Sequence, residues 1–134
     1  MMTFPAITAL CAGILGVIGI VLASQVGAGR GKSKVGIGDG GDEELFCRIR
    51  KHGNFSEYAP LGIILLGLLE MSGAAGAMAI YILGASLVIG RILHPLGLKE
   101  KGEETILRLV GVLATFLMIF VTSLWLIYNY LTAM

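Results

Sequence analysis

Apolar and polar stretches alternate along the chain with lengths typical of membrane helices. An uncharged apolar stretch runs from Phe4 to Val26, and a second runs from Leu61 to Gly90 with a single charge, Glu70. The second stretch is too long for one ordinary membrane helix, which needs roughly 20 residues, and too short for two. A helix must therefore begin earlier, in the polar sequence before Leu61. We predict four helices, at about 4–26, 44–70, 74–97 and 104–131.

The polar stretches between these helices predict three connections. Residues 27–44 are rich in glycine and charge, and residues 97–104 are polar, so both are expected to form loops. The segment 70–76, EMSGAAG, predicts a tight turn in which Glu70 is a solvated loop residue. Trp125, Tyr128 and Tyr130 lie near the end of the last helix and suit the aromatic belt at a membrane surface.

The distribution of positive charge supports four helices. All ten Lys and Arg residues fall at 30–51, at 91 or at 99–108. With four helices, the first and third loops lie on one side of the membrane, whereas three or five would divide the basic residues between both sides. Because basic loops stay in the cytoplasm, we predict that these two loops are cytoplasmic and that both termini lie opposite.

Composition identifies the chain as an integral membrane protein. Its 134 residues suffice for one domain, 1–134; they are 56% hydrophobic and 14% charged, against roughly 25% charged in soluble domains. The net charge of +1 gives no indication of nucleic-acid binding. The first apolar stretch lacks a basic start and exceeds the roughly 7–15 residues of a signal-peptide core, so we interpret it as a retained helix. Cys11 and Cys47 match no metal-site spacing, and we expect neither a disulfide nor a metal site.

The predicted second helix carries polar side chains on two faces. At 100° per residue, Asn54 lies about 40° from Arg50 and Glu57 about 20° from it on the other side, so these three share a face. Arg48 and His52 form a second pair on nearly the opposite face. Basic residues at a membrane boundary can simply extend toward water. Asn54 and Glu57 lie one to two turns deeper than that explains, and ionisable groups inside membrane helices are functional candidates by default.

Other basic groups are expected at the same membrane side. Arg91 and His94 lie three residues apart near the end of the third helix, and Arg30 begins the first loop. Basic groups from all four helices thus converge at one depth. This arrangement predicts a pocket for a small polyanion that opens toward the cytoplasm.

Arg108 stands in the first turns of the fourth helix. A cation at a helix N-terminus gains nothing from the helix dipole, which favours anions there. Its position is explained either by pairing with Glu103 or Glu104 or by binding of an anion.

These residues resemble the MAPEG family, the membrane-associated proteins in eicosanoid and glutathione metabolism. That family has a pattern in helix two that reads here as Arg50, Asn54, Glu57, Tyr58 and Pro60. The resemblance covers most of the chain, including RILH on the third helix and ILRL on the fourth, and the segment DGGDEELFCRIRKHGNFSEYAPL looks most like the bacterial branch. It implies an all-α bundle of four transmembrane helices, assembled as a homotrimer that binds glutathione between neighbouring subunits.

The resemblance also implies roles for single residues. Arg108 matches the arginine that faces the glutathione thiol in catalytic members, although the tyrosine that some members place before it is absent from 98–107. The residues expected to hold glutathione are Arg30, Arg50, His52, Asn54, Glu57, Tyr58, Arg91 and His94.

The chemistry of glutathione fits these residues. Its two carboxylates suit the two parallel hydrogen bonds of an arginine fork, and Glu57 could take its ammonium. A guanidinium beside the thiol favours the thiolate, which could then attack an electrophile arriving from the lipid.

We therefore predict a glutathione transferase or peroxidase for lipophilic small molecules in a bacterial inner membrane. The alternative is a non-catalytic MAPEG-like protein that binds lipid or another ligand. A small four-helix drug exporter is disfavoured, because such proteins usually carry a carboxylate in helix one and residues 4–26 have none.

Overall fold

The computed structural model describes residues 4–99, 103 and 105–133, and the secondary structure that it contains is helical. The four helices are α1 (Ala6–Ser33), α2 (Glu43–Ser72), α3 (Ala77–Gly97) and α4 (Ile106–Thr132). Each is long and apolar enough to cross a membrane. The predicted all-α bundle of four membrane helices is confirmed.

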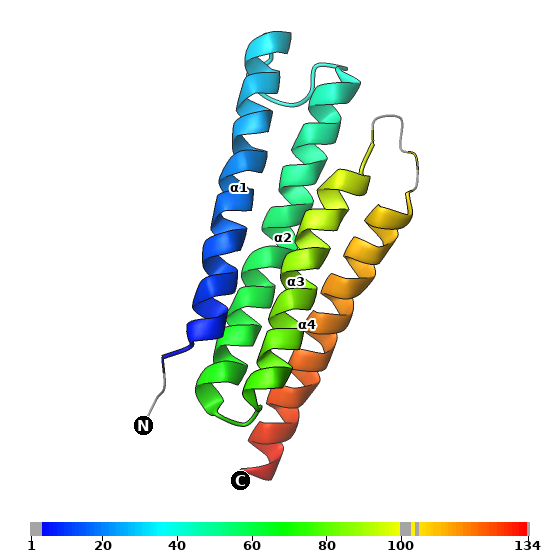
Figure 1. Ribbon diagram of the computed structural model, residues 1–134. Coiled ribbons are helices and arrows are strands. Elements are labelled where there is room, and N and C mark those ends of the chain that lie inside the picture. Colours follow the sequence, from blue (N-terminus) through cyan, green and yellow to red (C-terminus); the bar gives the residue numbers. More distant parts are fainter. Residues whose placement is uncertain (1–3, 100–102, 104, 134) are drawn as a thin grey trace.

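The helices run up and down side by side (Figure 1). The described ends of the chain and the short α2–α3 turn lie at one end of the bundle, and the α1–α2 and α3–α4 connections lie at the other. At that second end α1 and α2 extend beyond α3 and α4. The first turns of α2, which begin with Glu43 and Glu44, therefore project past α3 and α4, where water can solvate their charged side chains.

Helix α1 is longer than the sequence predicted. It continues to Ser33 through the glycine-rich stretch that we expected to be a loop from residue 27. Tertiary contact explains the difference, because a Cβ on Gly29 would lie 3.0 Å from the Leu45 side chain and 3.2 Å from that of Arg48. The α1–α2 connection then ends at Asp42, which caps α2 by accepting from Leu45 N at 3.1 Å and also accepts from the Ser33 hydroxyl.

Glu70 is not the solvated loop residue that the sequence predicted. It lies in the last turns of α2, and the turn to α3 begins only at Gly73, which has the left-handed φ of 67° that glycine tolerates. The Glu70 carboxylate accepts hydrogen bonds from Ile7 N at 3.0 Å, Thr8 N at 2.8 Å and Thr8 Oγ1 at 2.6 Å. Because Pro5 at the N-cap of α1 offers no side-chain cap, a carboxylate from α2 satisfies the first turn of α1 instead.

Glycines bring α3 and α4 close together in the half of the bundle nearer the α3–α4 connection. A Cβ on Gly111 would lie 2.6 Å from His94 N, and one on Gly97 would lie 2.2 Å from Arg108 N. A Cβ on Gly90 would lie 2.6 Å from Thr115 Oγ1. The absence of side chains at these three glycines therefore lets the two helices approach closely.

The outer faces of the helices are apolar, as a lipid-exposed bundle requires. Exposed residues include Ile20 on α1, Ile64 on α2 and Leu117 on α4. Tyr128 and Tyr130 are exposed and fit the predicted aromatic belt, but Trp125 packs against the core.

Candidate functional site

Arg91 is buried between three helices. Its side chain is 1% exposed, although guanidinium groups are almost never fully buried without an ionic partner. From α3 it donates to Asn54 Oδ1 on α2 at 2.8 Å and to Thr115 Oγ1 on α4 at 2.9 Å, and Nη2 reaches the Gly111 carbonyl oxygen at 3.4 Å. The Gly90–Gly111 approach makes this possible, because it brings the α4 backbone within reach of Arg91.

Tyr58 covers another side of Arg91. The Arg91 Cζ lies 5.6 Å from the centroid of the Tyr58 ring, a cation–π distance. The Tyr58 ring in turn packs against Phe116 of α4, with centroids 5.1 Å apart and planes at 49°. Arg91 thus holds two of the residues predicted from helix two, Asn54 and Tyr58, in fixed positions.

His94 lies one turn beyond Arg91 and is surrounded by positive charge. It is 4% exposed, and its Nδ1 has no hydrogen-bond partner among the described residues. The charges of Arg91, Arg108 and Arg50 all act on its ring. Four of the predicted site residues therefore do gather in one region of the bundle, which we call the arginine cluster: Arg50, Arg91, His94 and Arg108.

The arginine cluster has a surplus of positive charge within the described part of the chain. The ion pairs found there join Glu44 to Lys32 and to Arg48, and Lys99 to Glu103, and none of them includes a member of the cluster. Arg50 and Glu57 share an exposed face of α2 without forming an ion pair. Cations without an anion in a low-dielectric region are costly, so the arrangement favours binding of an anion.

Glu103 and Glu104 are the two carboxylates that the sequence offers as partners of Arg108. Glu103 lies 4.0 Å from Lys99, and Glu104 lies outside the described residues. The Arg108 backbone N–H is capped by Thr105 Oγ1 at 3.2 Å, and its half-buried side chain lines a cavity of about 390 Å³. The cavity leaves this guanidinium accessible to a ligand.

Two of the predicted residues lie away from the arginine cluster. Arg30, at the end of α1, donates to the carbonyl oxygens of Gly36 at 3.2 Å and Gly38 at 2.9 Å and so organises the first loop. His52 faces α1, where it lines a groove that includes Gly19. The predicted two-faced character of helix two is therefore present, but a single copy of the chain does not bring both faces to one site.

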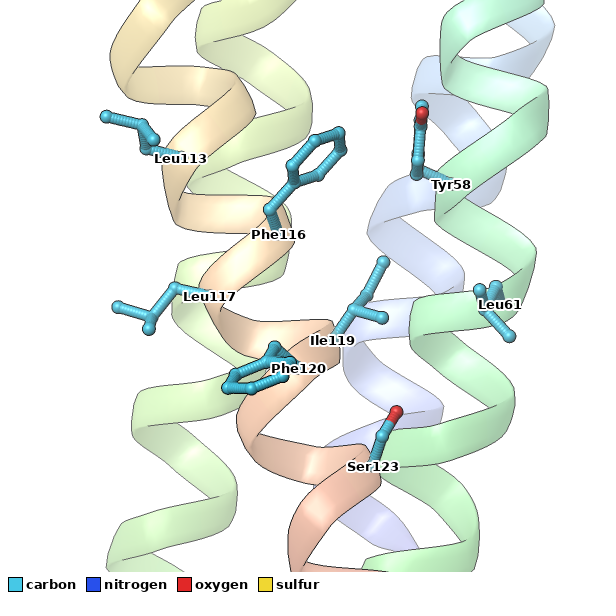
Figure 2. Close-up of a pocket in the computed structure, with 8 residues that line it drawn as sticks. All are labelled: Tyr58, Leu61, Leu113, Phe116, Leu117, Ile119, Phe120 and Ser123. Carbon is cyan, nitrogen blue, oxygen red and sulfur yellow. The ribbon is translucent and has the colours of Figure 1, made fainter.

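An open apolar groove adjoins Tyr58 between α2 and α4 (Figure 2). Its volume is about 580 Å³. The lining residues are Tyr58, Leu61, Leu113, Phe116, Leu117, Ile119, Phe120 and Ser123. Tyr58 thus borders both the contacts of Arg91 and a surface suited to an apolar molecule.

Sequence reasoning missed the α4 side of the site. Thr115, Gly111 and Phe116 all contact predicted residues, yet none has a charge or a motif that distinguishes it. The available signal was helical spacing, because Gly111 and Thr115 lie one turn apart on one face of α4. The sequence does not reveal that this face meets Arg91.

Comparison with known proteins identifies a family. The model of the MAPEG family matches residues 8–128. Two curated relatives are the inner membrane protein YecN of Escherichia coli strain K12 and the protein of the same name in strain O6:H1 CFT073, each 43% identical over 68 residues. Each match covers 51% of this chain and 51% of the relative, so about half of each relative's length is aligned. No solved structure matches the chain.

Proposed function

The chain belongs to the MAPEG family, and from this premise we propose that it binds glutathione at the arginine cluster and activates the thiol against lipophilic electrophiles. The observation that carries the proposal is the surplus of guanidinium groups around His94, to which no described carboxylate is paired. A tripeptide with two carboxylates and a thiol supplies the missing negative charge.

Each part of glutathione has a suitable group. Arg50 is exposed and can bind a carboxylate through two parallel hydrogen bonds, and Glu57 on the same face can take the ammonium. Arg91 is too deeply buried to bind ligand in this conformation, so it acts by holding Asn54 and Tyr58 and by adding positive potential. Its neighbour His94 is also buried, so its unpartnered Nδ1 lies beneath the site rather than at the ligand in this conformation.

Arg108 is assigned to the thiol. Free thiols have a pKa of roughly 8.5 and are mostly protonated at neutral pH. A guanidinium beside the sulfur stabilises the thiolate, and each unit by which the pKa falls corresponds to about 1.4 kcal/mol. The thiolate then attacks an electrophile that arrives laterally from the lipid, where apolar molecules concentrate.

We further propose that the protein is a homotrimer with glutathione between neighbouring copies. Glu57 lies fourteen residues after Glu43, roughly 21 Å along α2 at about 1.5 Å per residue, and is exposed. An ionised carboxylate facing hydrocarbon at mid-helix is unfavourable, so a second copy and its ligand must cover it. Such an arrangement also gives a role to Arg30 and His52, which face away from the arginine cluster and can serve the site of a neighbouring copy.

The proposed location is the bacterial inner membrane. The names of the two relatives support it, as does the presence of four membrane-spanning helices. The loops that connect α1 to α2 and α3 to α4 carry the Lys and Arg residues and are assigned to the cytoplasm, with both termini opposite.

Substitution of Arg108 separates binding from chemistry. Arg108→Ala is expected to abolish glutathione conjugation while glutathione still binds, and Arg50→Ala is expected to weaken binding by at least about tenfold, which is 1.4 kcal/mol. Calorimetry in nanodiscs measures glutathione binding, and mass spectrometry of the conjugate measures glutathione conjugation. Lys34→Ala, a loop cation outside the cluster, is the matched control. Unchanged turnover in Arg108→Ala rejects the role of Arg108, and absence of heat in the wild type rejects the glutathione site.

A second candidate function is non-catalytic binding of a lipid or another apolar ligand. The open apolar groove beside Tyr58 favours it. Ultraviolet absorbance of the thiolate discriminates between the two functions. An increase when glutathione is added to the protein supports the enzyme, and glutathione binding without that increase supports the binding protein.

A further inference from the structure

Thr115 anchors the Arg91 guanidinium from α4. Its hydroxyl donates to the Gly111 carbonyl oxygen one turn back at 2.9 Å, so the hydroxyl proton is already committed within the helix. The lone pairs of the same oxygen accept from Arg91 Nε, also at 2.9 Å. Because Thr115 is 0% exposed, bulk water is kept away from this contact.

The anchored guanidinium decides which end of the Asn54 amide faces Arg91. A guanidinium is planar and its donors point in fixed directions, so holding Nε also sets the direction of Nη1. Nη1 donates to Asn54 Oδ1 at 2.8 Å. Since a guanidinium has donors and no acceptor, it can meet the amide only at the oxygen, and the amide NH2 group must point elsewhere.

The amide nitrogen of Asn54 is left for a ligand. Among the described hydrogen bonds, the Asn54 side chain takes part through its oxygen, as the acceptor from Arg91. The buried side-chain atoms without a partner in the described part of the chain are His94 Nδ1 and Asn129 Nδ2, so Asn54 Nδ2 is not sealed in the core. Asn54 is half-buried on the helix face that it shares with Arg50. Two N–H donors thus lie at the edge of the arginine cluster, where negative charge is favoured.

We propose that Thr115 is a positioning residue of the glutathione site, which acts through Arg91 to turn the NH2 group of Asn54 toward a carboxylate of the ligand. This inference rests on the proposed function, which brings glutathione to the arginine cluster. The NH2 group offers donors only, so it selects an anionic oxygen and gives the ammonium of glutathione no acceptor at this point. The ammonium is then left to Glu57, as the proposed function requires.

Removal of the Thr115 hydroxyl tests these contacts. Thr115→Val keeps the shape of the side chain and is expected to weaken glutathione binding about tenfold, as for loss of one hydrogen bond to a charged group. Thr115→Ser keeps the hydroxyl and is expected to retain the wild-type affinity. Thr122→Val is the matched control, because Thr122 is also fully buried on α4 and donates to the Met118 carbonyl oxygen at 2.7 Å, with no described contact to an arginine. Calorimetry in nanodiscs measures all four affinities.

A double-mutant cycle separates positioning from a general effect on the fold. In an Asn54→Ala background the amide is already absent, so adding Thr115→Val is expected to weaken glutathione binding no further. An equal loss of affinity in both backgrounds means that Thr115 acts through helix packing, and it overturns the inference. Wild-type affinity in Thr115→Val alone also overturns it.

Substitution of Asn54 by aspartate tests the direction of the amide, even if Thr115→Val does not fold. Asn54→Asp keeps an oxygen for Arg91 but replaces the NH2 group with a second anionic oxygen. The ligand-free Tm is expected to rise, because the buried guanidinium gains a charged partner, whereas glutathione affinity is expected to fall further than in Asn54→Ala. Stronger glutathione binding by Asn54→Asp means that the ammonium meets Asn54, and it overturns the inference while the proposed function stands. If the wild type binds no glutathione, the proposed function itself fails.

Discussion

At one end of the bundle the Glu70 carboxylate accepts three hydrogen bonds from α1, whereas further along the bundle the Arg91 guanidinium is buried among neutral acceptors. Glu70 meets the two backbone N–H groups of the first turn of α1 and the Thr8 hydroxyl, and the positive end of the α1 dipole lies beside it. The charge of Glu70 is therefore compensated within a single copy of the chain.

The Arg91 region differs because its charges are not compensated. The neighbouring guanidinium groups of Arg50 and Arg108 add to the positive charge, and none of the described ion pairs relieves it. A compensated polar site serves the fold, whereas an uncompensated one lowers the stability of the empty protein and is retained for what it binds. Substitution in the Glu70 region is thus expected to lower the stability of the ligand-free protein, and apolar substitution in the Arg91 region is expected to raise it.

The largest effect is expected when the Arg91–Asn54 pair is replaced by apolar side chains. The double substitution Arg91→Met and Asn54→Leu removes both members of the 2.8 Å hydrogen bond, so neither is left unsatisfied. Ligand-free stability is expected to rise by about 1–2 kcal/mol, because apolar replacement of buried polar pairs is often stabilising. Glutathione at 100 times its Kd should stabilise the wild type by about 2.7 kcal/mol and the variant not at all. Thermal unfolding in detergent, with and without glutathione, measures both changes.

A loss of stability in that variant contradicts the view that the Arg91 region, unlike the Glu70 region, destabilises the ligand-free protein. If the ligand-free double variant unfolds about 3 kcal/mol more easily, Arg91 is a structural connection between helices like Glu70. The single variant Arg91→Lys is a useful companion, because it keeps the charge but loses the fork that reaches Asn54 and Thr115 together. It is expected to be less stable than the wild type.

The second effect concerns Glu70. Glu70→Ala leaves Ile7 N and Thr8 N without an acceptor and is expected to destabilise the bundle by about 2 kcal/mol, at the upper end for loss of a helix cap. Glu70→Gln keeps one acceptor oxygen and should lose about half as much. Glutathione affinity is expected to stay unchanged in both, as calorimetry can check. A variant that keeps its stability but loses glutathione affinity contradicts the assignment of Glu70 to the fold.

The sequence allowed the four helices and the two faces of helix two to be predicted, because both depend on local patterns. Runs of apolar residues set the number of helices, and the period of 100° per residue placed Asn54 apart from His52. In the structure Asn54 accepts from Arg91 on α3, and His52 lies in the groove against α1.

Tertiary contacts decided what the sequence could not predict. Glu70 caps a helix that begins more than sixty residues earlier in the chain. Local sequence patterns do not predict a contact between residues so far apart in the chain. Helix α1 continues past residue 27 because Gly29 packs against Leu45 and Arg48, although glycine by itself disfavours a helix. The partners of Arg91 on α4 depend on the close approach of Gly90 and Gly111, which only the packed bundle shows.

The smallest effect is expected at Asp42, a carboxylate that caps α2 in the first loop. The hydrogen bond from the Ser33 hydroxyl, followed by that from Leu45 N, holds the pKa of Asp42 below its usual value. A lowered folded-state pKa contributes stability that is complete above the unfolded value of about 3.9 and is lost as the pH falls through the folded value. Between pH 6 and pH 3 the Tm of the wild type is therefore expected to fall further than that of Asp42→Asn, with Asp39→Asn as the control. Equal falls in Tm for Asp42→Asn and the wild type mean that the charge of the Asp42 carboxylate adds nothing to stability, because water competes for its hydrogen bonds. Carboxylates then stabilise this bundle only where, as at Glu70, they join two helices.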